Sequence, residues 1–368
     1  MTQTERLRSV DDLDVIVDCD VHLTERQEDI LPYIGSPFAE MLERNPAGDD
    51  YGYLSSFYPS PGFLTPVHTG KVQSDTVRTA EQVKAGMEML GTDRAVITPT
   101  QNLYLGCVQH DELAAALASA YNEFLLDRIL EPESGLYGAI LVAPQRPDLA
   151  AEEIDRLADE SGIIAAFVPS GGVSPPLGHR RYDPIYDACE RAGLPLMMHN
   201  AAGTMMMSFP LQFQGFSRYL SSHVPAHAMQ HMTHLSSMLT HGVPVRYPDL
   251  EFVIQEAGLG WIPYLMRRFD HEYSAKREDA PLLEQPPSEY LRDQFYFTSQ
   301  PVEGADDPEY IRSIVSLFGG ESNLLFSSDY PHLDFDHSGA LFNMLRGQLD
   351  DEALANIYGE TATEVFDF

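Results

Sequence analysis

The chain has 368 residues, a length typical of one large α/β barrel, and 43% of them are hydrophobic, which is enough to bury a sizeable core. Its 23 Lys and Arg residues against 56 Asp and Glu residues give a formal net charge of −33. A surface this negative repels phosphate backbones and anionic lipids, which argues against a nucleic-acid binder and against a partner of membranes.

The charge balance also bears on the solvent in which the protein works. Only three residues are lysines, namely Lys71, Lys84 and Lys276. In dilute buffer so many carboxylates would repel one another, whereas molar salt shortens the Debye length to about 3 Å and screens that repulsion. We therefore expect a protein from a salt-accumulating cell, a halophile; the alternative is an ordinary acidic protein.

Cysteine usage and the N-terminus indicate the compartment. The three cysteines, Cys19, Cys107 and Cys189, lie far apart and form no C-x-x-C pair, which is typical of a reducing compartment and predicts no thiolate metal site. The N-terminal run MTQTERLRSVDDLD lacks an apolar signal core, and no apolar run is long enough to span a bilayer. We expect a cytoplasmic protein.

Short β-rich runs alternate with helical patterns along the whole chain. The predicted strands are Val15–Cys19, Ala95–Thr98, Tyr137–Val142, Ile163–Val168, Leu196–His199, Glu251–Gln255, Phe295–Thr298 and Asn323–Ser327. The predicted helices are Asp111–Leu130, Asp148–Glu160, Pro184–Ala192, Ala226–Thr240, Trp261–Glu272, Pro308–Leu317 and Ala340–Leu349. Eight strands alternating with helices predict a (β/α)8 TIM barrel, with residues 1–368 as a single domain.

Two long insertions interrupt the minimal barrel pattern. Residues 31–75, rich in Pro, Gly, Tyr and Ser, follow the first strand, and residues 200–222, rich in Met, Phe and Gln, follow the fifth. Both leave the carboxyl end of a strand, where barrel enzymes place their active sites and where long loops usually cover a ligand. The first insertion is too aromatic for a freely solvated loop, and we expect it to form either a lid or a subunit contact in a homo-oligomer.

The first strand reads V-I-V-D-C-D-V-H. Because side chains alternate across a strand, Asp18, Asp20 and His22 lie on one face. An aspartate and a histidine that point the same way suit a divalent metal with mixed oxygen and nitrogen ligands. Alone, such a pair is more often the hydrogen-bonded start of a loop.

Ligand-type residues also end three other apolar strands. His199 ends the fifth strand, Glu256 follows the sixth, and Asp329 follows the eighth with His332 close behind. Charged groups aimed into one barrel mouth are costly to bury unpaired, and a metal ion removes that cost. The pattern therefore predicts a metal site at the carboxyl ends of the strands.

These motifs together resemble the amidohydrolase superfamily. D-x-D-x-H on strand one, the histidine after strand five and S-D-Y-P-H on strand eight are similar to its amidohydrolase 2 branch, which includes aminocarboxymuconate-semialdehyde decarboxylase and the resorcylate decarboxylases. The runs G-V-P-V-R-Y-P-D-L-E-F-V-I-Q-E-A-G-L-G-W-I-P-Y at 242–264, R-R-F-D at 267–270 and L-L-F-S-S-D-Y-P-H at 324–332 also match, so the resemblance covers about residues 14 to 366. It implies a metal-containing barrel whose ligands are Asp20, His22, His199 and Asp329.

The chain departs from the family pattern in two places. Asp20 replaces the first histidine of the H-x-H that many members carry, and Glu256 stands where the decarboxylases have a catalytic histidine. No lysine lies near the end of strand four, so the carbamylated lysine that bridges two metals in other amidohydrolases has no counterpart, and we expect one metal ion. Two imidazoles and two carboxylates suit Zn²⁺ or Mn²⁺.

Three functions fit these residues. The first is a metal-dependent hydrolase of a small cyclic or carboxylated organic molecule, in which Glu256 or Asp329 takes a proton from metal-activated water and His332 stabilises the oxyanion. The second is a non-oxidative decarboxylase of an aromatic or unsaturated acid, in which Glu256 protonates the ring carbon. The third is a metal- or ligand-binding barrel without turnover.

Several further residues have weaker signals. We expect Glu25 and His227 to contact the substrate. His227 belongs to a stripe, His223, His227, His231 and His234, that we predict to be a partly solvated helix face with only His227 turned toward the mouth. We expect Trp261 to pack in the core, and Arg267 and Arg268 to form surface ion pairs.

Overall fold

The protein is described here from a computed structural model, which covers residues 7–44, 54, 76–213, 215–216, 218–304, 306–332 and 335–368. Eight parallel strands form one sheet in sequence order: β1 (Val17–Leu23), β2 (Arg94–Pro99), β3 (Leu136–Leu141), β4 (Ile163–Pro169), β5 (Leu196–His199), β6 (Phe252–Ile254), β7 (Phe295–Thr298) and β8 (Leu324–Leu325). The predicted (β/α)8 barrel is confirmed.

Backbone hydrogen bonds join β1 to the residues that follow β8 and so bring the two edges of the sheet together. The Cys19 amide donates to the Phe326 carbonyl over 3.0 Å, and the His22 amide donates to the Tyr330 carbonyl over 2.7 Å. The Asp329 amide donates to the Asp20 carbonyl over 3.0 Å, so two candidate site residues are joined through their backbones.

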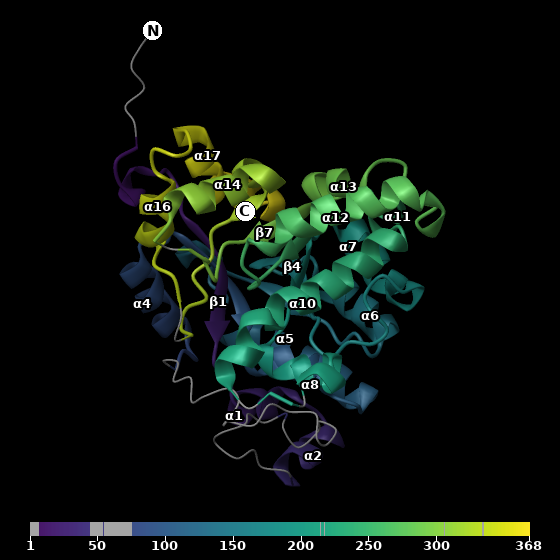
Figure 1. Ribbon diagram of the computed structural model, residues 1–368. Helices are drawn as coiled ribbons and strands as arrows, with labels where there is room; N and C mark the ends of the chain where they lie inside the picture. Colours follow the sequence, from purple (N-terminus) through teal and green to yellow (C-terminus); the bar gives the residue numbers. More distant parts are fainter. Residues whose placement is uncertain are drawn as a thin grey trace.

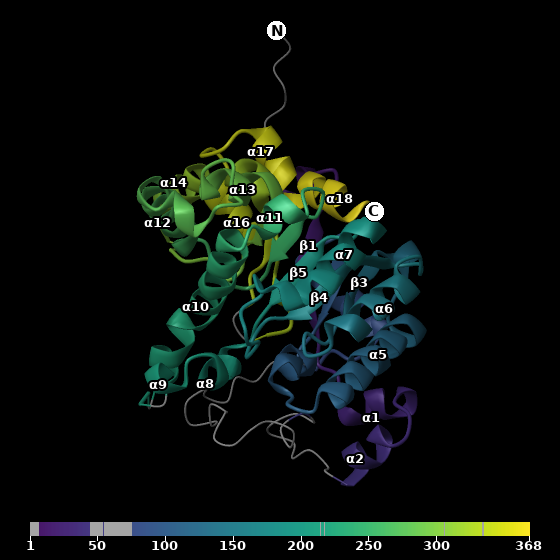
Figure 2. The same cartoon turned by 90° about the vertical axis from the view of Figure 1, so that its right-hand side faces the viewer.

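Helices surround the strands (Figures 1 and 2). They are α1 (Gln27–Ile30), α2 (Phe38–Arg44), α4 (Ala80–Leu90), α5 (Asp111–Arg128), α6 (Pro147–Leu157), α7 (Asp183–Ala192), α8 (Met205–Ser208), α9 (Pro210–Phe213), α10 (Tyr219–Thr240), α11 (Val243–Arg246), α12 (Trp261–Ala275), α13 (Pro287–Gln294), α14 (Pro308–Phe318), α15 (Gly320–Asn323), α16 (Ser338–Leu345), α17 (Asp351–Ala355) and α18 (Thr361–Phe366). The long helix α10 runs from the end of the molecule that carries α8 and α9 toward α11 (Figures 1 and 2).

Strand β1 shows why its sequence alternates between apolar and ionisable residues. All seven of its residues are buried. Val17, Cys19, Val21 and Leu23 pack in the apolar cluster that also contains residues of α4 and α5. Asp18, Asp20 and His22 point to the other face, toward the ends of β2 and β8, so a strand covered on both sides carries polar groups only where they find polar partners.

The observed elements differ from the predicted ones mainly at their ends. Strand β1 extends to Leu23 because its pairing with β2 continues through His22 opposite Thr98. Strand β8 ends after two residues because Ser327 and Ser328 turn into hydrogen bonds with Ser299 and Asp18. Ten of the described helices were not predicted, of which α4 and α13 are the longest, and α10 begins seven residues earlier than expected.

Part of the first insertion lies outside the described residues. The structure shows residues 31–44, which include α2, whereas residues 45–53 and 55–75 are not described. The lid or subunit contact predicted there therefore stays a prediction. Among the described helices, none combines the length and apolarity needed to cross a lipid bilayer.

Candidate active site

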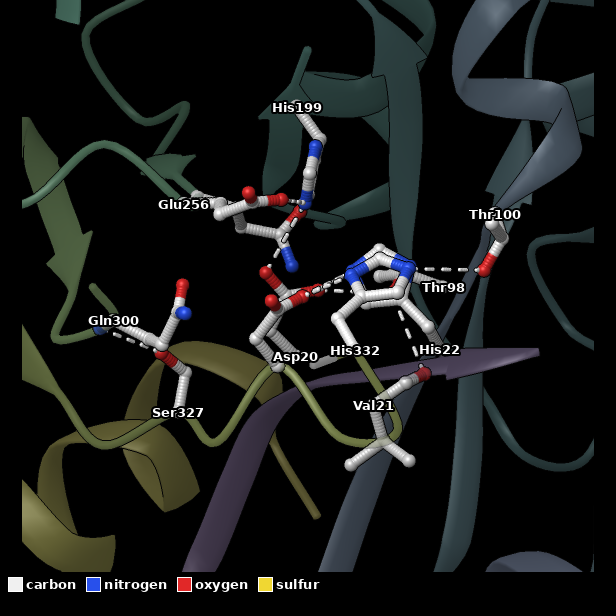
Figure 3. A network of polar contacts seen from close by, with 12 residues as sticks. Asp20, Val21, His22, Thr98, Thr100, His199, Glu256, Gln300, Ser327 and His332 are labelled. Carbon is white, nitrogen blue, oxygen red and sulfur yellow. Dashed lines mark hydrogen bonds and ion pairs between the residues drawn. The ribbon is translucent and has the colours of Figure 1, made fainter. Parts of the chain in front are cut away.

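Six predicted site residues come together at the carboxyl ends of the strands, and Figure 3 labels all of them except Asp329. Asp20 and His22 come from β1, His199 from the end of β5, Glu256 from the residue pair after β6, and Asp329 and His332 from the loop after β8. Residues more than 300 positions apart in the chain thus meet because parallel barrel strands all end at the same face.

Two histidines present one ring nitrogen each to the centre of this cluster. His22 donates from Nδ1 to the Pro99 carbonyl over 2.9 Å, and His199 donates from Nδ1 to the Asn200 carbonyl over 2.8 Å. These hydrogen bonds set the tautomer and leave the Nε2 lone pairs facing inward. A hydrogen bond also orients the Asp20 carboxylate, since its Oδ1 accepts from Thr98 Oγ1 over 2.8 Å.

The Nε2 lone pairs face carboxylate oxygens. His22 Nε2 lies 3.1 Å from Asp329 Oδ1 and 3.4 Å from Asp20 Oδ1, and His199 Nε2 lies 3.2 Å from Asp20 Oδ2. Lone pairs and carboxylates repel unless a proton or a metal cation lies between them. His22 Nε2, His199 Nε2, Asp20 Oδ2 and Asp329 Oδ2 are all buried without a hydrogen-bond donor. Two overlapping groups here could each hold a divalent ion, Asp20 with His22 and His199, and His22 with Glu256, Asp329 and His332; within each group the possible ligand atoms lie within 4.8 Å of one another.

Burial and charge act against each other at these carboxylates. Burial raises the pKa of Asp20, but the adjacent His199 and His22 outweigh it, so the pKa is lowered overall. Burial raises the pKa of the neighbouring Asp18 to about 7. Asp18 Oδ1 accepts from the Ser328 amide over 2.9 Å, so this side chain ties the loop after β8 to β1.

Glu256 and Asp329 have strained backbones. Their φ angles are 44° and 64°, in the left-handed region that side chains other than glycine rarely adopt. Each such residue costs on the order of 1–3 kcal/mol and persists only where its surroundings hold it. The Glu256 amide donates to Thr298 Oγ1 over 3.1 Å, and the Asp329 amide is held by Asp20 as described above.

The Glu256 carboxyl group lies between two imidazoles. Its Oε2 is 3.2 Å from His199 Nε2, and its Oε1 is 3.3 Å from Nε2 of His227 on α10. Burial raises the pKa of Glu256, but His227 and His199 outweigh it and lower the pKa overall. Glu256 is thus a buried carboxyl group at the edge of the cluster, and it also contacts His227, which lies outside the six residues.

His332 supports Asp329. Its Nδ1 donates to Asp329 Oδ1 over 2.7 Å, and its Nε2 lies 3.4 Å from Thr100 Oγ1. Burial disfavours the charged ring, but the Asp329 carboxylate outweighs burial and raises the pKa of His332 to about 9. A divalent cation on Asp329 would oppose that charge.

Glu25 is buried one step away from the cluster. Its Oε1 accepts from the amide and side chain of Asn102 over 2.8 and 3.0 Å, and its Oε2 accepts from the Thr100 amide over 3.0 Å. Burial raises its pKa to about 7. Glu25 therefore positions the loop after β2, and its expected contact with substrate stays a prediction.

The prediction of a partly solvated histidine stripe holds for His223, which is half-buried, but was wrong for the other three members. His227, His231 and His234 are all buried. His231 Nε2 donates to the Gln255 carbonyl and His234 Nε2 to the Ser170 carbonyl, each over 2.9 Å. The reason is that α10 lies against the ends of β4 and β6, where unpaired strand-end carbonyls need donors.

Two other expectations about side chains agree with the structure. Trp261 is buried with its ring 5.9 Å from that of Phe297. Arg268 forms an exposed ion pair with Glu272 over 2.6 Å, whereas Arg267 is exposed without an ion pair among the described residues. Thr98 and Thr298 were not predicted as site residues, although their hydroxyl groups form hydrogen bonds with the Asp20 carboxylate and the Glu256 amide. Their signal was available, because each is a polar residue at the end of an apolar strand.

A parallel (β/α)8 barrel with histidines and aspartates clustered at the carboxyl ends of its strands defines a class of metal-binding enzymes. A family model described as "Amidohydrolase" matches residues 17–368, and the chain belongs to this family. The resemblance found in the motifs is thereby confirmed.

Curated relatives in this family are decarboxylases. The gamma-resorcylate decarboxylase of Polaromonas sp. is 24% identical over 236 residues, which covers 60% of this chain and 68% of the relative. The gamma-resorcylate decarboxylase of a Rhizobium sp. is 23% identical over 245 residues, covering 62% of this chain and 70% of the relative.

Solved structures share the fold. An amidohydrolase of Mycobacterium avium subsp. paratuberculosis superposes with a TM-score of 0.75 at 19% identity, covering 96% of this chain and 100% of its own. The 5-carboxyvanillate decarboxylase of Novosphingobium aromaticivorans, in complex with manganese and 4-hydroxy-3-methoxy-5-nitrobenzoic acid, superposes with a TM-score of 0.69 at 20% identity, covering 96% of each chain.

Proposed function

We propose that this protein is a metal-dependent decarboxylase that releases CO2, without oxidation, from an aromatic acid with a hydroxyl group beside its carboxylate. The observation that carries the proposal is the buried Glu256 carboxyl group beside a set of ligands for one cation. Decarboxylation of this kind needs both parts, a cation for the substrate oxygens and a proton donor for the ring carbon. The decarboxylase relatives support this second expectation from the sequence better than the first, a hydrolase.

The residues that would hold the metal are Asp20, His22, His199 and Asp329, and the manganese of a solved relative makes Mn²⁺ the first choice over Zn²⁺. When bound, the ion supplies positive charge for the substrate's carboxylate and hydroxyl oxygens. His22 and His199 keep their Nε2 atoms directed at it through the Nδ1 hydrogen bonds described above, and His332 orients Asp329.

Glu256 is the proton donor in this proposal. Its proton moves to the ring carbon that bears the carboxylate, and a pair of ring electrons forms the new C–H bond. The bond between that carbon and the carboxylate then breaks, its electron pair returns to the ring, and CO2 leaves. Glu256 recovers a proton from water, so one proton is consumed per CO2 released. His227 and His199 lower the pKa of Glu256 overall, but burial acts in the opposite direction, and a substrate that displaces water strengthens the effect of burial.

Identifying the reaction products tests the proposed function. Protein loaded with Mn²⁺ is incubated with a panel of ortho-hydroxybenzoates that includes 2,6-dihydroxybenzoate and 5-carboxyvanillate, the acids named for solved relatives. We expect CO2 and the matching phenol in equal amounts, and none from protein stripped of metal. Hydrolysis of lactones or cyclic amides without CO2 release from any acid would overturn the proposal in favour of a hydrolase. Bound metal without turnover on either panel would instead favour a barrel that only binds its ligand.

A further inference from the structure

Helix α10 brings one side chain from outside the strands to the reacting group. Its residue His227 is buried, and Nε2 lies 3.3 Å from Oε1 of Glu256. We propose that His227 is a positioning residue that holds the Glu256 carboxyl group toward the substrate, in place of the substrate contact expected from the sequence. The inference rests on the function proposed above.

His199 cannot donate a hydrogen bond to the Glu256 carboxyl group once a metal is bound. His199 donates from Nδ1 to the Asn200 carbonyl, so its Nε2 has only a lone pair to offer. A cation takes that lone pair, and the 3.2 Å contact with Glu256 Oε2 then has no hydrogen to share. Among the described ion-pair partners of the Glu256 carboxyl group, only His227 remains as a donor.

His227 is suited to donate that hydrogen bond. Neither ring nitrogen of His227 has a hydrogen-bond partner among the described residues, so the hydrogen on Nε2 can be given to Oε1 of Glu256, which lies 3.3 Å away and accepts whether Oε2 is ionised or protonated. Helix α10 is anchored beside this contact because His231, one turn further along, donates to the carbonyl of Gln255, the residue immediately before Glu256. Helix α10 and the loop after β6 are therefore joined at two adjacent residues.

Glu256 needs such a restraint. Its backbone is strained at a φ angle of 44°, and the described restraint on that backbone is the hydrogen bond from its amide to Thr298 Oγ1. A carboxyl group released from His227 could turn toward the cation and become a further ligand. A misplacement of about 1 Å at a reacting group costs about 100-fold in rate.

The contact itself is tested by NMR on protein labelled with ¹⁵N in its histidines and loaded with Zn²⁺, which is diamagnetic. His227→Gln identifies the His227 signals. We expect His227 with its hydrogen on Nε2, and a shift of that signal in Glu256→Leu. A hydrogen on Nδ1, or a signal that Glu256→Leu does not move, would overturn the proposal, and this result does not depend on any substrate.

The consequence is tested by kinetics and metal content. In His227→Leu we expect one metal ion per chain, a KM within about threefold of wild type and a kcat about 100-fold lower. His227→Gln, whose amide nitrogen can donate to the same oxygen, should recover most of that loss. His271→Gln, which changes an exposed histidine on α12, should match wild type.

Two kinetic results would overturn the proposal. One is a His227→Leu variant with wild-type kcat. The other is a His227→Leu variant whose kcat falls only in proportion to its loss of bound metal. A Gln variant that keeps its metal and is as inactive as the Leu variant would also contradict positioning through this hydrogen bond. If wild type releases no CO2 from any acid, the proposed function fails, whereas the NMR result still decides whether His227 holds Glu256.

Discussion

At the scale of single residues, the site combines groups whose identity the sequence reveals with a geometry that it hides. Asp20, His22 and Asp329 are predictable because ligand-type residues at strand ends are rare in an apolar barrel. The strained backbone of Glu256 is not predictable, because a φ angle of 44° depends on partners 42 residues away, such as Thr298. The same holds for Glu25, whose partners Thr100 and Asn102 belong to another loop.

The residue whose role is sharpest is Glu256. We expect Glu256→Gln to keep its metal, because the amide leaves the four proposed ligands in place, and to lose CO2 release by at least about 100-fold, because it cannot give up a proton as an acid. The initial rate of CO2 release and the metal content measure the two effects. Glu251→Gln is the matched control, since that side chain accepts from Tyr296 over 3.0 Å at the other end of β6. A Glu256→Gln variant with wild-type turnover would exclude Glu256 as the proton donor.

At the scale of elements, all eight strands follow from the sequence, whereas the burial of α10 does not. The strands are predictable because continuous apolar runs bounded by polar residues recur along the chain. The histidines of α10 follow helical spacing, and such spacing looks the same whether a helix faces water or strand-end carbonyls. Only the tertiary packing separates the two cases.

The buried histidines of α10 predict a stability that depends on pH. Both ring nitrogens of His234 are used, because Nε2 donates to Ser170 and Nδ1 accepts from the Leu177 amide over 3.2 Å. Burial lowers the pKa of His234 to about 4. Below pH 6.5 the unfolded chain therefore binds a proton that the native ring does not, so stability falls as the pH drops from about 6.5 toward 4.

His234→Gln removes this titration. We expect the free energy of unfolding of the variant to fall less steeply between pH 6.5 and pH 4, by up to about 1.4 kcal/mol per pH unit. Urea unfolding at several pH values measures the slope, which is compared between the two proteins because the substitution also lowers stability at neutral pH. Equal slopes in wild type and variant would contradict the account of α10.

At the scale of the whole molecule, the barrel was predictable from the alternation of strands and helices. The net negative charge leads to a separate prediction about stability. The net charge is −33, and arginines such as Arg146 and Arg156 already form ion pairs with surface carboxylates over 2.6 to 2.8 Å. Because 56 acidic residues face 23 basic ones, most of the acidic residues have no basic residue to pair with. The relatives reported above do not support an origin in a halophile, so that expectation stays a prediction from charge.

The dependence of stability on salt tests the prediction from charge. If repulsion between carboxylates limits stability, the free energy of unfolding should be larger in molar KCl than in dilute buffer, because salt screens the repulsion. Urea unfolding in both solutions, with an uncharged osmolyte at equal osmolality as a control, measures the difference. Equal stability in the two salt conditions would show that the protein is an ordinary acidic one.

The central claim is one divalent metal ion held by Asp20, His22, His199 and Asp329. Elemental analysis of protein purified in molar KCl without added metal tests it most directly, with a His199→Ala variant beside it. The account predicts about one Mn or Zn per chain in wild type and a loss of that metal in the variant. Protein without metal, and without a rise in melting temperature when Mn²⁺ or Zn²⁺ is added, would reduce the cluster to a polar network and leave the family resemblance as evidence for the fold alone.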